Sequence, residues 1–414
     1  MGGNAIFQIS VAVLVAFLLV VCLFQAAGVW QYVRRVYEAA DRPVPTVSRW
    51  PRICVYVPVR GGGPTWRGAL EHLLSLDYPD FEVFVVVDHP TDPATEVITS
   101  LIQERQDGRL RMEFLRDPSP HRSLYCSGLV QFFEQLDPSC ELVAFCGADM
   151  HLPRSFFREM AAPMLAAEVG CTLGNRWYRP QMGSLGSIVR YSWNSGAVVP
   201  MWTSQIPWGG AAVLRPADIR RSGLLQAWSK GMVEDAPIRA AMQRLGLQLI
   251  FVPKLLVIHD DEIDLGPCRE FIKRQLLWTR LYHPHWSFVV LHAILGTAAV
   301  YAPWLLAMFA IGVGHYAMAT VLALTGFLYW CCQALLGAIL EQAARKIAAA
   351  NGQPLPRMKW SLMAKIFLAI PLTQLLFAMA VVSCTWLKRV QWSGIEYEIR
   401  DSYDVRLVQY HPVA

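Results

Sequence analysis

The chain has 414 residues, enough for more than one domain. Hydrophobic residues make up 54% of it and charged residues only 17%, whereas about a quarter of a typical soluble domain is charged. The net charge of +5 is modest and forms no concentrated basic patch, which argues against a nucleic-acid partner and suits a protein that lies against anionic lipid. The ten cysteines show no metal-binding spacing, so we expect them to be reduced and structural.

The excess of apolar residues collects in four runs, the first of which lies at the start of the chain. Residues 5–30 contain no charged residue, and this run exceeds the roughly 20 residues that a helix needs to cross a bilayer. A cleaved signal peptide is the alternative, but the run is too long for one and no Lys or Arg precedes it. Arg34 and Arg35 follow directly, so residues 1–35 are predicted to form a membrane helix that leads into the cytosol.

The other apolar runs predict three membrane helices within residues 287–387. These runs are residues 287–313, 315–340 and 366–387. Basic residues before the last run place the connection that precedes it in the cytosol. Counting the crossings then sends the tail, residues 388–414, to the opposite side. Pro371 lies inside the last run, and a re-entrant helix broken there would instead keep the tail in the cytosol.

Residues 50–284 form the segment that can build a water-soluble core, and apolar strand patterns alternate there with helical ones. This alternation predicts an α/β domain with a mostly parallel sheet. Ligands of such sheets bind beyond the carboxyl ends of the strands. The strand at residues 53–59 ends in a glycine-rich turn, residues 60–64, which could let a nucleotide approach the backbone or could be a plain loop.

Aspartates follow two more predicted strands, at residues 81–87 and 141–146. Asp88 and Asp92, after the first strand, could accept hydrogen bonds from a base and a ribose, although a Pro/Asp turn explains them equally well. Asp149, after the second strand, could hold Mg²⁺ or Mn²⁺ against a diphosphate, because hard cations prefer oxygen ligands.

Two later stretches supply candidates for the acceptor side of a site. The glycines of Trp208-Gly209-Gly210 would let a sugar approach the main chain. Glu234 and Asp235 precede a helical run, where the positive end of the helix dipole keeps a carboxylate ionised, as a general base requires. On their own these two carboxylates are more simply explained as the acidic start of a helix.

An amphipathic helix is predicted at residues 271–282. Its apolar face could lie on the membrane surface. Its cationic side chains, Arg274 and Arg280, could neutralise a leaving diphosphate. The two roles are compatible.

Together these features resemble the membrane-bound family 2 glycosyltransferases of the GT-A fold, and most closely their ceramide glucosyltransferase-like branch. The resemblance covers nearly the whole chain, from one leading membrane helix through a cytosolic GT-A domain to three trailing helices. The matching motifs are the early aspartates from Asp88 to Ala94, the strand-end Gly147-Ala148-Asp149, the glycine-rich stretch from Trp208 to Arg215, the Glu234-Asp235 pair and the stretch from Arg274 to Trp278. In the tail, residues 390–397 are similar to the WxGxxY element that often ends such chains.

The resemblance implies an inverting transfer of a single sugar from a nucleotide-sugar, expected to be a UDP-sugar, to a hydroxyl of a membrane lipid. Asp235 would be the catalytic base, with Glu234 beside it. The implied contacts to the nucleotide-sugar are Pro58, Arg60, Asp88, Asp92, Asp149, Arg274, Gln275, Trp278 and Arg280. The acceptor and sugar pocket would contain Trp208, Gly209 and Gly210, and Asp149 would hold a divalent Mg²⁺ or Mn²⁺.

Two departures from the family pattern matter. Gly147 stands where the DxD motif has its first aspartate, and Leu277 stands where the (Q/R)xxRW motif has its arginine. Gly147 predicts a weakened metal site, and Leu277 predicts that the leaving diphosphate is bound differently. Two other functions stay open: a processive polysaccharide synthase and a catalytically impaired GT-A membrane scaffold. No motif encodes the sugar, the lipid or the oligomeric state.

Overall fold

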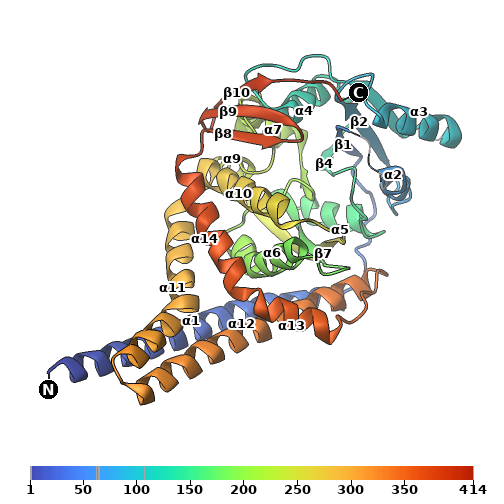
Figure 1. The fold of residues 1–414 in the computed structure, drawn as a ribbon. Helices are drawn as coiled ribbons and strands as arrows, with labels where there is room; N and C mark the ends of the chain where they lie inside the picture. The colour runs from blue at the N-terminus through green and yellow to red at the C-terminus, as the bar shows by residue number, and fades with distance from the viewer. Residues whose placement is uncertain (1, 62, 64–65, 107, 414) are drawn as a thin grey trace.

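A seven-stranded sheet forms the centre of the domain in the computed structural model of the protein, which describes residues 2–61, 63, 66–106 and 108–413 (Figure 1). The strand order is β3-β2-β1-β4-β6-β5-β7, and the strands are β1 (Ile53–Val59), β2 (Phe81–Val87), β3 (Leu110–Phe114), β4 (Leu142–Phe145), β5 (Val169–Tyr178), β6 (Ala212–Leu214) and β7 (Gln248–His259). β6 is antiparallel to both of its neighbours, and every other pairing among these strands is parallel. The predicted fold class, an α/β domain of the GT-A type, is therefore confirmed.

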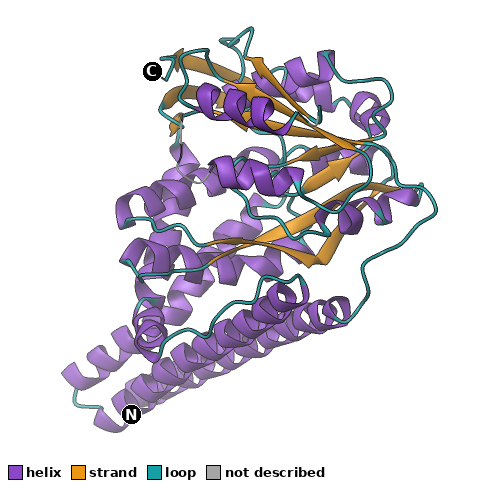
Figure 2. Cartoon of the chain, turned by 90° about the vertical axis from the view of Figure 1, so that its right-hand side faces the viewer, coloured by secondary structure: helices purple, strands orange, loops and turns teal. Residues whose placement is uncertain are grey.

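Helices cover both faces of the sheet, which explains why its central strands are nearly continuous apolar runs (Figure 2). Successive side chains of a strand point to opposite faces. Alternate side chains of β1 therefore pack under α2 (Trp66–Leu74) and α3 (Ala94–Arg105), and the others pack against α4 (Leu124–Glu134). Residues 62 and 64 of the predicted glycine-rich turn lie outside the described residues.

The remaining helices of the domain surround the second half of the sheet. They are α5 (Phe156–Ala161), α6 (Leu185–Thr203), α7 (Pro216–Ser222), α8 (Leu224–Trp228), α9 (Ile238–Arg244) and α10 (Leu265–Tyr282), with a short 3₁₀ helix at Pro163–Leu165. α10 contains the helix predicted at residues 271–282 but begins earlier. Gly266 and Pro267 argue against helix in the sequence, yet proline in a first turn removes no hydrogen bond that the helix needs.

Three long helices carry most of the apolar excess: α1 (Gly2–Ala40), α11 (Trp286–Gly312) and α12 (Tyr316–Ala350). Each is long and apolar enough to cross a membrane. α1 and α12 lie side by side at the foot of the molecule in Figure 1. At about 1.5 Å per residue, the 39 residues of α1 exceed a bilayer core of about 30 Å, so its last turns reach past the apolar run to the domain.

The fourth apolar run forms two helices rather than one. α13 (Trp360–Leu368) and α14 (Ile370–Trp386) meet at a bend of 46° directly before Pro371. The chain before α13 is held to the domain, because the side-chain amide of Asn351 donates a hydrogen bond to the carbonyl of Lys254 at 2.8 Å. α14 then runs back along α10 to the domain (Figure 1). Both ends of the pair lie at the domain, which favours the re-entrant alternative over a fourth crossing.

The tail forms a three-stranded antiparallel sheet of β8 (Arg389–Trp392), β9 (Ile395–Asp401) and β10 (Asp404–Gln409) that packs on the domain. The backbone N–H of Leu407 donates to the carbonyl of Pro120 at 2.9 Å, and the N–H of Leu124 donates to the hydroxyl of Tyr397 at 3.3 Å. The expectation from counting crossings, that the tail lies across the membrane from the domain, is therefore wrong. A bent fourth run returns the chain to the side from which it came.

We predict that the domain and the tail are labelled from the same side of a sealed vesicle. Asp117→Cys in the domain and Arg406→Cys in the tail place thiols at exposed positions, and Val313→Cys places one at the far end of α11. A membrane-impermeant maleimide should modify the first two from one side and the third only from the other. The unsubstituted chain gives the background, and labelling of Arg406→Cys together with Val313→Cys would contradict the arrangement.

Candidate active site

The first group of predicted donor residues lies at the carboxyl ends of β1 and β2. Asp88, 6% exposed, directly follows β2 and forms an ion pair with Arg60, which directly follows β1. The two oxygens of Asp92 accept hydrogen bonds from the backbone N–H groups of Gly61 and of the first residue of α3, at 2.7 and 2.9 Å. Pro58 lies in β1 beside β2. The structure thus brings these residues together at one edge of the sheet.

The end of the tail lies over this group, which no motif in the sequence indicates. The guanidinium of Arg60 donates from Nη2 to the carbonyl of His411 at 2.7 Å. The hydroxyl of Tyr410 donates to Oδ1 of Asp88 at 3.3 Å, and the ring of Tyr410 lies under the Arg60 guanidinium. The tail therefore covers part of the edge at which a nucleotide is expected.

Asp149 follows β4 at an exposed position, where neighbouring protein atoms nevertheless crowd its carboxyl group. This desolvation raises its pKa, and the negative charge of Asp261 raises it further. A Cβ at Gly147 would come within 2.7 Å of Oδ1 of Asp149 and 2.6 Å of Cε of Met150, so both of these side-chain ends would shift to admit a side chain there. Across the described part of the chain, no three His, Cys, Asp or Glu side chains form a group that could hold a metal ion.

Glu234 and Asp235 are neighbours in the loop before α9 but have different surroundings. Oδ2 of Asp235 accepts a hydrogen bond from the N–H of Gly209 at 2.9 Å, and this side chain faces a large cavity. Glu234 is 7% exposed and lies behind it, and its backbone carbonyl accepts a hydrogen bond from the Trp228 indole at 3.0 Å. The N-cap of α9 is Pro237, so the simpler explanation of the pair as a helix cap does not hold.

The two carboxyl groups of this pair differ in the causes that shift their pKa values. Burial raises the pKa of Glu234 well above its ordinary value, and the negative charge of Asp235 raises it further. Burial also raises the pKa of Asp235, but the backbone N–H groups of Gly209 and Ala236 and the positive charge of Arg176 lower it. When the pair holds one proton, the proton therefore lies on Glu234, and Asp235 is the ionised member. An ionised carboxylate that faces a cavity is in the state that a general base needs.

The glycines of the predicted acceptor stretch allow the main chain to pack against the pair. A Cβ at Gly209 would overlap the carboxyl group of Glu234, and one at Gly210 would overlap Trp208 and Met150. Trp208 is itself buried. The structure therefore brings these three predicted residues next to Asp235, where they form one wall of the site.

Predicted residues of α10 separate into two groups. Oε1 of Gln275 accepts a hydrogen bond from Arg176 at 2.9 Å, and Arg274 lies near the same guanidinium over the ring of Phe271. The ring of Trp278 lies 6.2 Å from that of Trp392, which ties the helix motif to the tail element.

Arg280, by contrast, lies away from the site. Its guanidinium donates to the backbone carbonyls of Cys384, Thr385 and Leu387, at distances from 2.5 to 3.2 Å, and so holds the end of α14 against α10. Leu277 is fully buried in the apolar cluster between these helices. Neither residue offers a charge to a bound diphosphate.

Two residues that the sequence did not single out belong to the site. Arg176 of β5 lies 5.5 Å from the ring centroids of Tyr178, Trp208 and Phe271, next to Asp235. An arginine inside a strand that is otherwise buried is the signal that could have found it. Tyr125 hydrogen-bonds Glu234 and stacks on a ring of the tail, and nothing local in the sequence indicates this.

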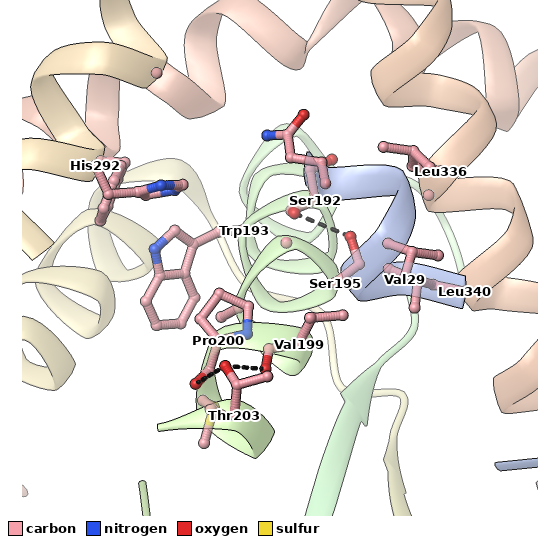
Figure 3. Close-up of a pocket in the computed structure, with 18 of the residues that line it drawn as sticks. Val29, Ser192, Trp193, Ser195, Val199, Pro200, Thr203, His292, Leu336 and Leu340 are labelled. Atoms are coloured by element: carbon pink, nitrogen blue, oxygen red, sulfur yellow. Dashed lines mark hydrogen bonds between the residues drawn. The ribbon is translucent and has the colours of Figure 1, made fainter. Parts of the chain in front are cut away.

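A cavity of about 1770 Å³ connects Asp235 with the long apolar helices. Figure 3 shows part of its lining: α6 contributes side chains in the middle, α1 and α12 close one side and α11 the other. The labelled residues include Ser192, Trp193, Val199, Val29, Leu336, Leu340 and His292. Ligand pockets usually hold about 300–1,000 Å³, so this cavity has room for a long apolar chain.

Fold and site together are those of a glycosyltransferase with the GT-A architecture. The sequence matches glycosyl transferase family 21 over residues 13–405, and the chain belongs to this family. Family 21 is ceramide glucosyltransferase-like, so the match supports the resemblance to that branch, and a fold like that of family 2 agrees with it.

Solved structures similar to this chain include a mannosyltransferase from Pyrobaculum calidifontis in complex with GDP-Man and Mn²⁺, at 16% identity and a TM-score of 0.47, with 90% of this chain and 99% of that chain covered. Another is GalNAc-T7 with UDP, GalNAc and Mn²⁺, at 11% identity and a TM-score of 0.43, with 62% and 55% covered. No curated protein matches the sequence.

We predict that Gly209→Ala lowers sugar transfer at least about 100-fold, because the added methyl overlaps the Glu234 carboxyl and displaces the loop that holds Asp235. Overpacking of this kind typically costs about 1–3 kcal/mol of folding stability, which thermal unfolding will detect. Gly266→Ala is the matched control, since a Cβ there meets nothing within 4 Å. Wild-type turnover of Gly209→Ala would show that the close packing is not needed.

Proposed function

We propose that the protein transfers a single sugar, with inversion, from a nucleotide-sugar to a hydroxyl group of a membrane lipid. The observation that carries this proposal is the cavity that runs from the apolar helices to Asp235. Membership of family 21 supports sugar transfer as the reaction. A UDP-sugar is the expected donor, by the resemblance of the early aspartate motif.

The path of the acceptor supports a lipid rather than a soluble sugar. Between α1, α6, α11 and α12 the cavity is lined largely by apolar side chains, among them Val29, Leu336 and Leu340 (Figure 3). Close to Asp235 it becomes polar and aromatic, with Arg176 and Trp208. Burial of an alkyl chain gains about 25 cal/mol per Å² of apolar surface, whereas a polar headgroup needs partners of the kind found near Asp235. An acceptor with one apolar and one hydroxyl-bearing end fits both regions.

The proposed chemistry is a single displacement. Asp235 takes the proton of the acceptor hydroxyl as its oxygen forms a bond to C1 of the sugar, and the bond from C1 to the diphosphate oxygen breaks. The leaving oxygen takes the electron pair, and the nucleoside diphosphate departs. Glu234 stays protonated behind the base. General-base help of this kind is typically worth about 10²–10⁴-fold in rate.

The donor is proposed to lie across the carboxyl edge of β1, β2 and β4. Arg60, Asp88 and Asp92 would contact the nucleoside, with Pro58 in the adjoining strand, and Asp149 would face the diphosphate. A divalent cation bound there would neutralise phosphate charge, with the phosphates themselves and water completing its coordination. The bilayer would hold the enzyme with this domain on the cytosolic side, as Arg34 and Arg35 after the apolar run of α1 indicate.

The experiment that tests the function is incubation of the protein in lipid nanodiscs with a panel of labelled nucleotide-sugars. We expect the label of at least one donor to move to a product that is extracted with the lipids. A label on a long polymer would favour the polysaccharide synthase, and no transfer or hydrolysis across the panel would favour the impaired scaffold.

We predict that Asp235→Asn and Glu234→Gln differ sharply. Asp235→Asn removes the base and should lower kcat at least 100-fold. Glu234→Gln replaces one neutral group with another and should cost no more than about 10-fold. Thermal unfolding of both variants checks that they fold. Near wild-type turnover of Asp235→Asn, or an equal loss in both variants, would contradict these assignments.

We also predict that activity tolerates metal removal better than a site with two DxD aspartates would allow. One carboxylate at the end of β4 binds a cation weakly, so less of the catalysis should depend on it. Turnover titrated against EDTA measures this dependence, with magnesium-saturated enzyme as the control. A complete loss that micromolar Mn²⁺ restores would show that a tight metal site exists.

A further inference from the structure

Two arginines share one aromatic ring beside Asp235. The guanidinium carbon of Arg176, in β5, lies 5.5 Å from the centroid of Phe271, and that of Arg274, in α10, lies 6.0 Å from the same centroid. Arg176 is 5% exposed. Burial lowers the pKa of Arg274, and the positive charge of Arg176 lowers it further.

The charges of this pair are only partly balanced in the described part of the chain. The ionised Asp235 acts on Arg176 and Glu270 acts on Arg274, but neither arginine has a carboxylate oxygen within ion-pair distance there. Arg176 donates from Nη2 to the neutral amide of Gln275, and its buried Nε has no hydrogen-bond partner. The carboxylate one turn before Arg274 in α10, Glu270, is paired with Lys273 at 2.6 Å and with Arg269 at 3.2 Å. Burying a cation without an anion is costly, so a pair of this kind indicates that an anionic ligand supplies the missing charge.

The two departures from the family pattern indicate where that anion comes from. Gly147 removes a carboxylate that would help to hold a metal, and Leu277 removes an arginine from α10. The first change weakens the binding of a metal cation, and the second removes a guanidinium. Both therefore leave less positive charge around a bound diphosphate. Arg176 approaches the same helix from the sheet, with its guanidinium between Phe271 and Gln275, and so restores a cation on that side of the site.

We propose that Arg176 and Arg274 together form a binding site for a phosphate oxyanion beside the catalytic base. This inference rests on the proposed function. The phosphate is supplied by the diphosphate of the donor, whose leaving oxygen gains negative charge as the bond to C1 breaks, or by a phosphate in the headgroup of the acceptor. Arginine suits this role because its planar donors match phosphate oxygens and it stays charged when buried.

The test measures binding of uridine, UMP and UDP to the full-length protein in phosphatidylcholine nanodiscs by calorimetry, with EDTA present so that no cation masks the effect. Arg176→Met and Arg274→Met should each weaken UDP binding about 10-fold or more and leave uridine binding unchanged, in line with the loss of a charged hydrogen bond. Arg176→Lys should recover part of the loss. Arg220→Met, at an exposed position of α7, is the matched control.

A second arm separates the two sources of phosphate. It compares transfer to a polyprenyl phosphate with transfer to the corresponding polyprenol. If UDP binding is unchanged but the variants lose their preference for the phosphate-bearing lipid, the oxyanion belongs to the acceptor. If neither UDP affinity nor acceptor preference differs from Arg220→Met while thermal unfolding shows folded protein, the inference is overturned.

A failure of the proposed function can be distinguished from a failure of the arginine site. Wild-type protein that binds neither UDP nor GDP and transfers no sugar would contradict the function. Binding of the polyprenyl phosphate over the polyprenol, lost in Arg176→Met and Arg274→Met, would then still support the arginine pair, and its absence would overturn it.

Discussion

Two neighbouring carboxyl groups pack against a glycine main chain: Glu234 is buried and Asp235 is half-buried. In this setting they cannot easily both be ionised. The N–H of Gly209 and the charge of Arg176 favour the ionised form of Asp235, so Glu234 keeps the proton. This constraint determines which of the two carboxyl groups is ionised. The ionised carboxylate faces the cavity, and the neutral one packs behind it next to Tyr125.

A single strand joins this site to the apolar helices. Side chains alternate along β5, and while Arg176 reaches the site, the indole of Trp177 donates to Glu341 of α12 at 2.9 Å. Arg179 lies 3.8 Å from the same carboxylate, and the group is almost fully buried. The position of α12, which forms one wall of the acceptor cavity, is thereby linked to the position of a charge beside the base.

The fold and the strand-end aspartates could be predicted because strand patterns and motif spacing are local in the sequence. Arg176 was not found because its partners, Phe271 and Gln275, are about a hundred residues away along the chain. The side of the tail stayed open in the sequence because counting crossings assumes straight helices, and only the packing of α14 on α10 reveals the bend. Arg280 matched a motif by position, but its contacts with the end of α14 direct it away from the site.

The central claim is that the acceptor lipid reaches Asp235 through the cavity between α1, α6, α11 and α12. Gly196 of α6 lines this cavity, and a Cβ there meets nothing within 4 Å, so Gly196→Trp is designed to place a bulky ring in the path of the lipid. The direct measurement is sugar transfer to lipid alongside UDP binding, with the exposed Gly266→Trp as control. The account predicts that Gly196→Trp loses lipid transfer while binding UDP normally. Unchanged transfer to lipid would contradict it.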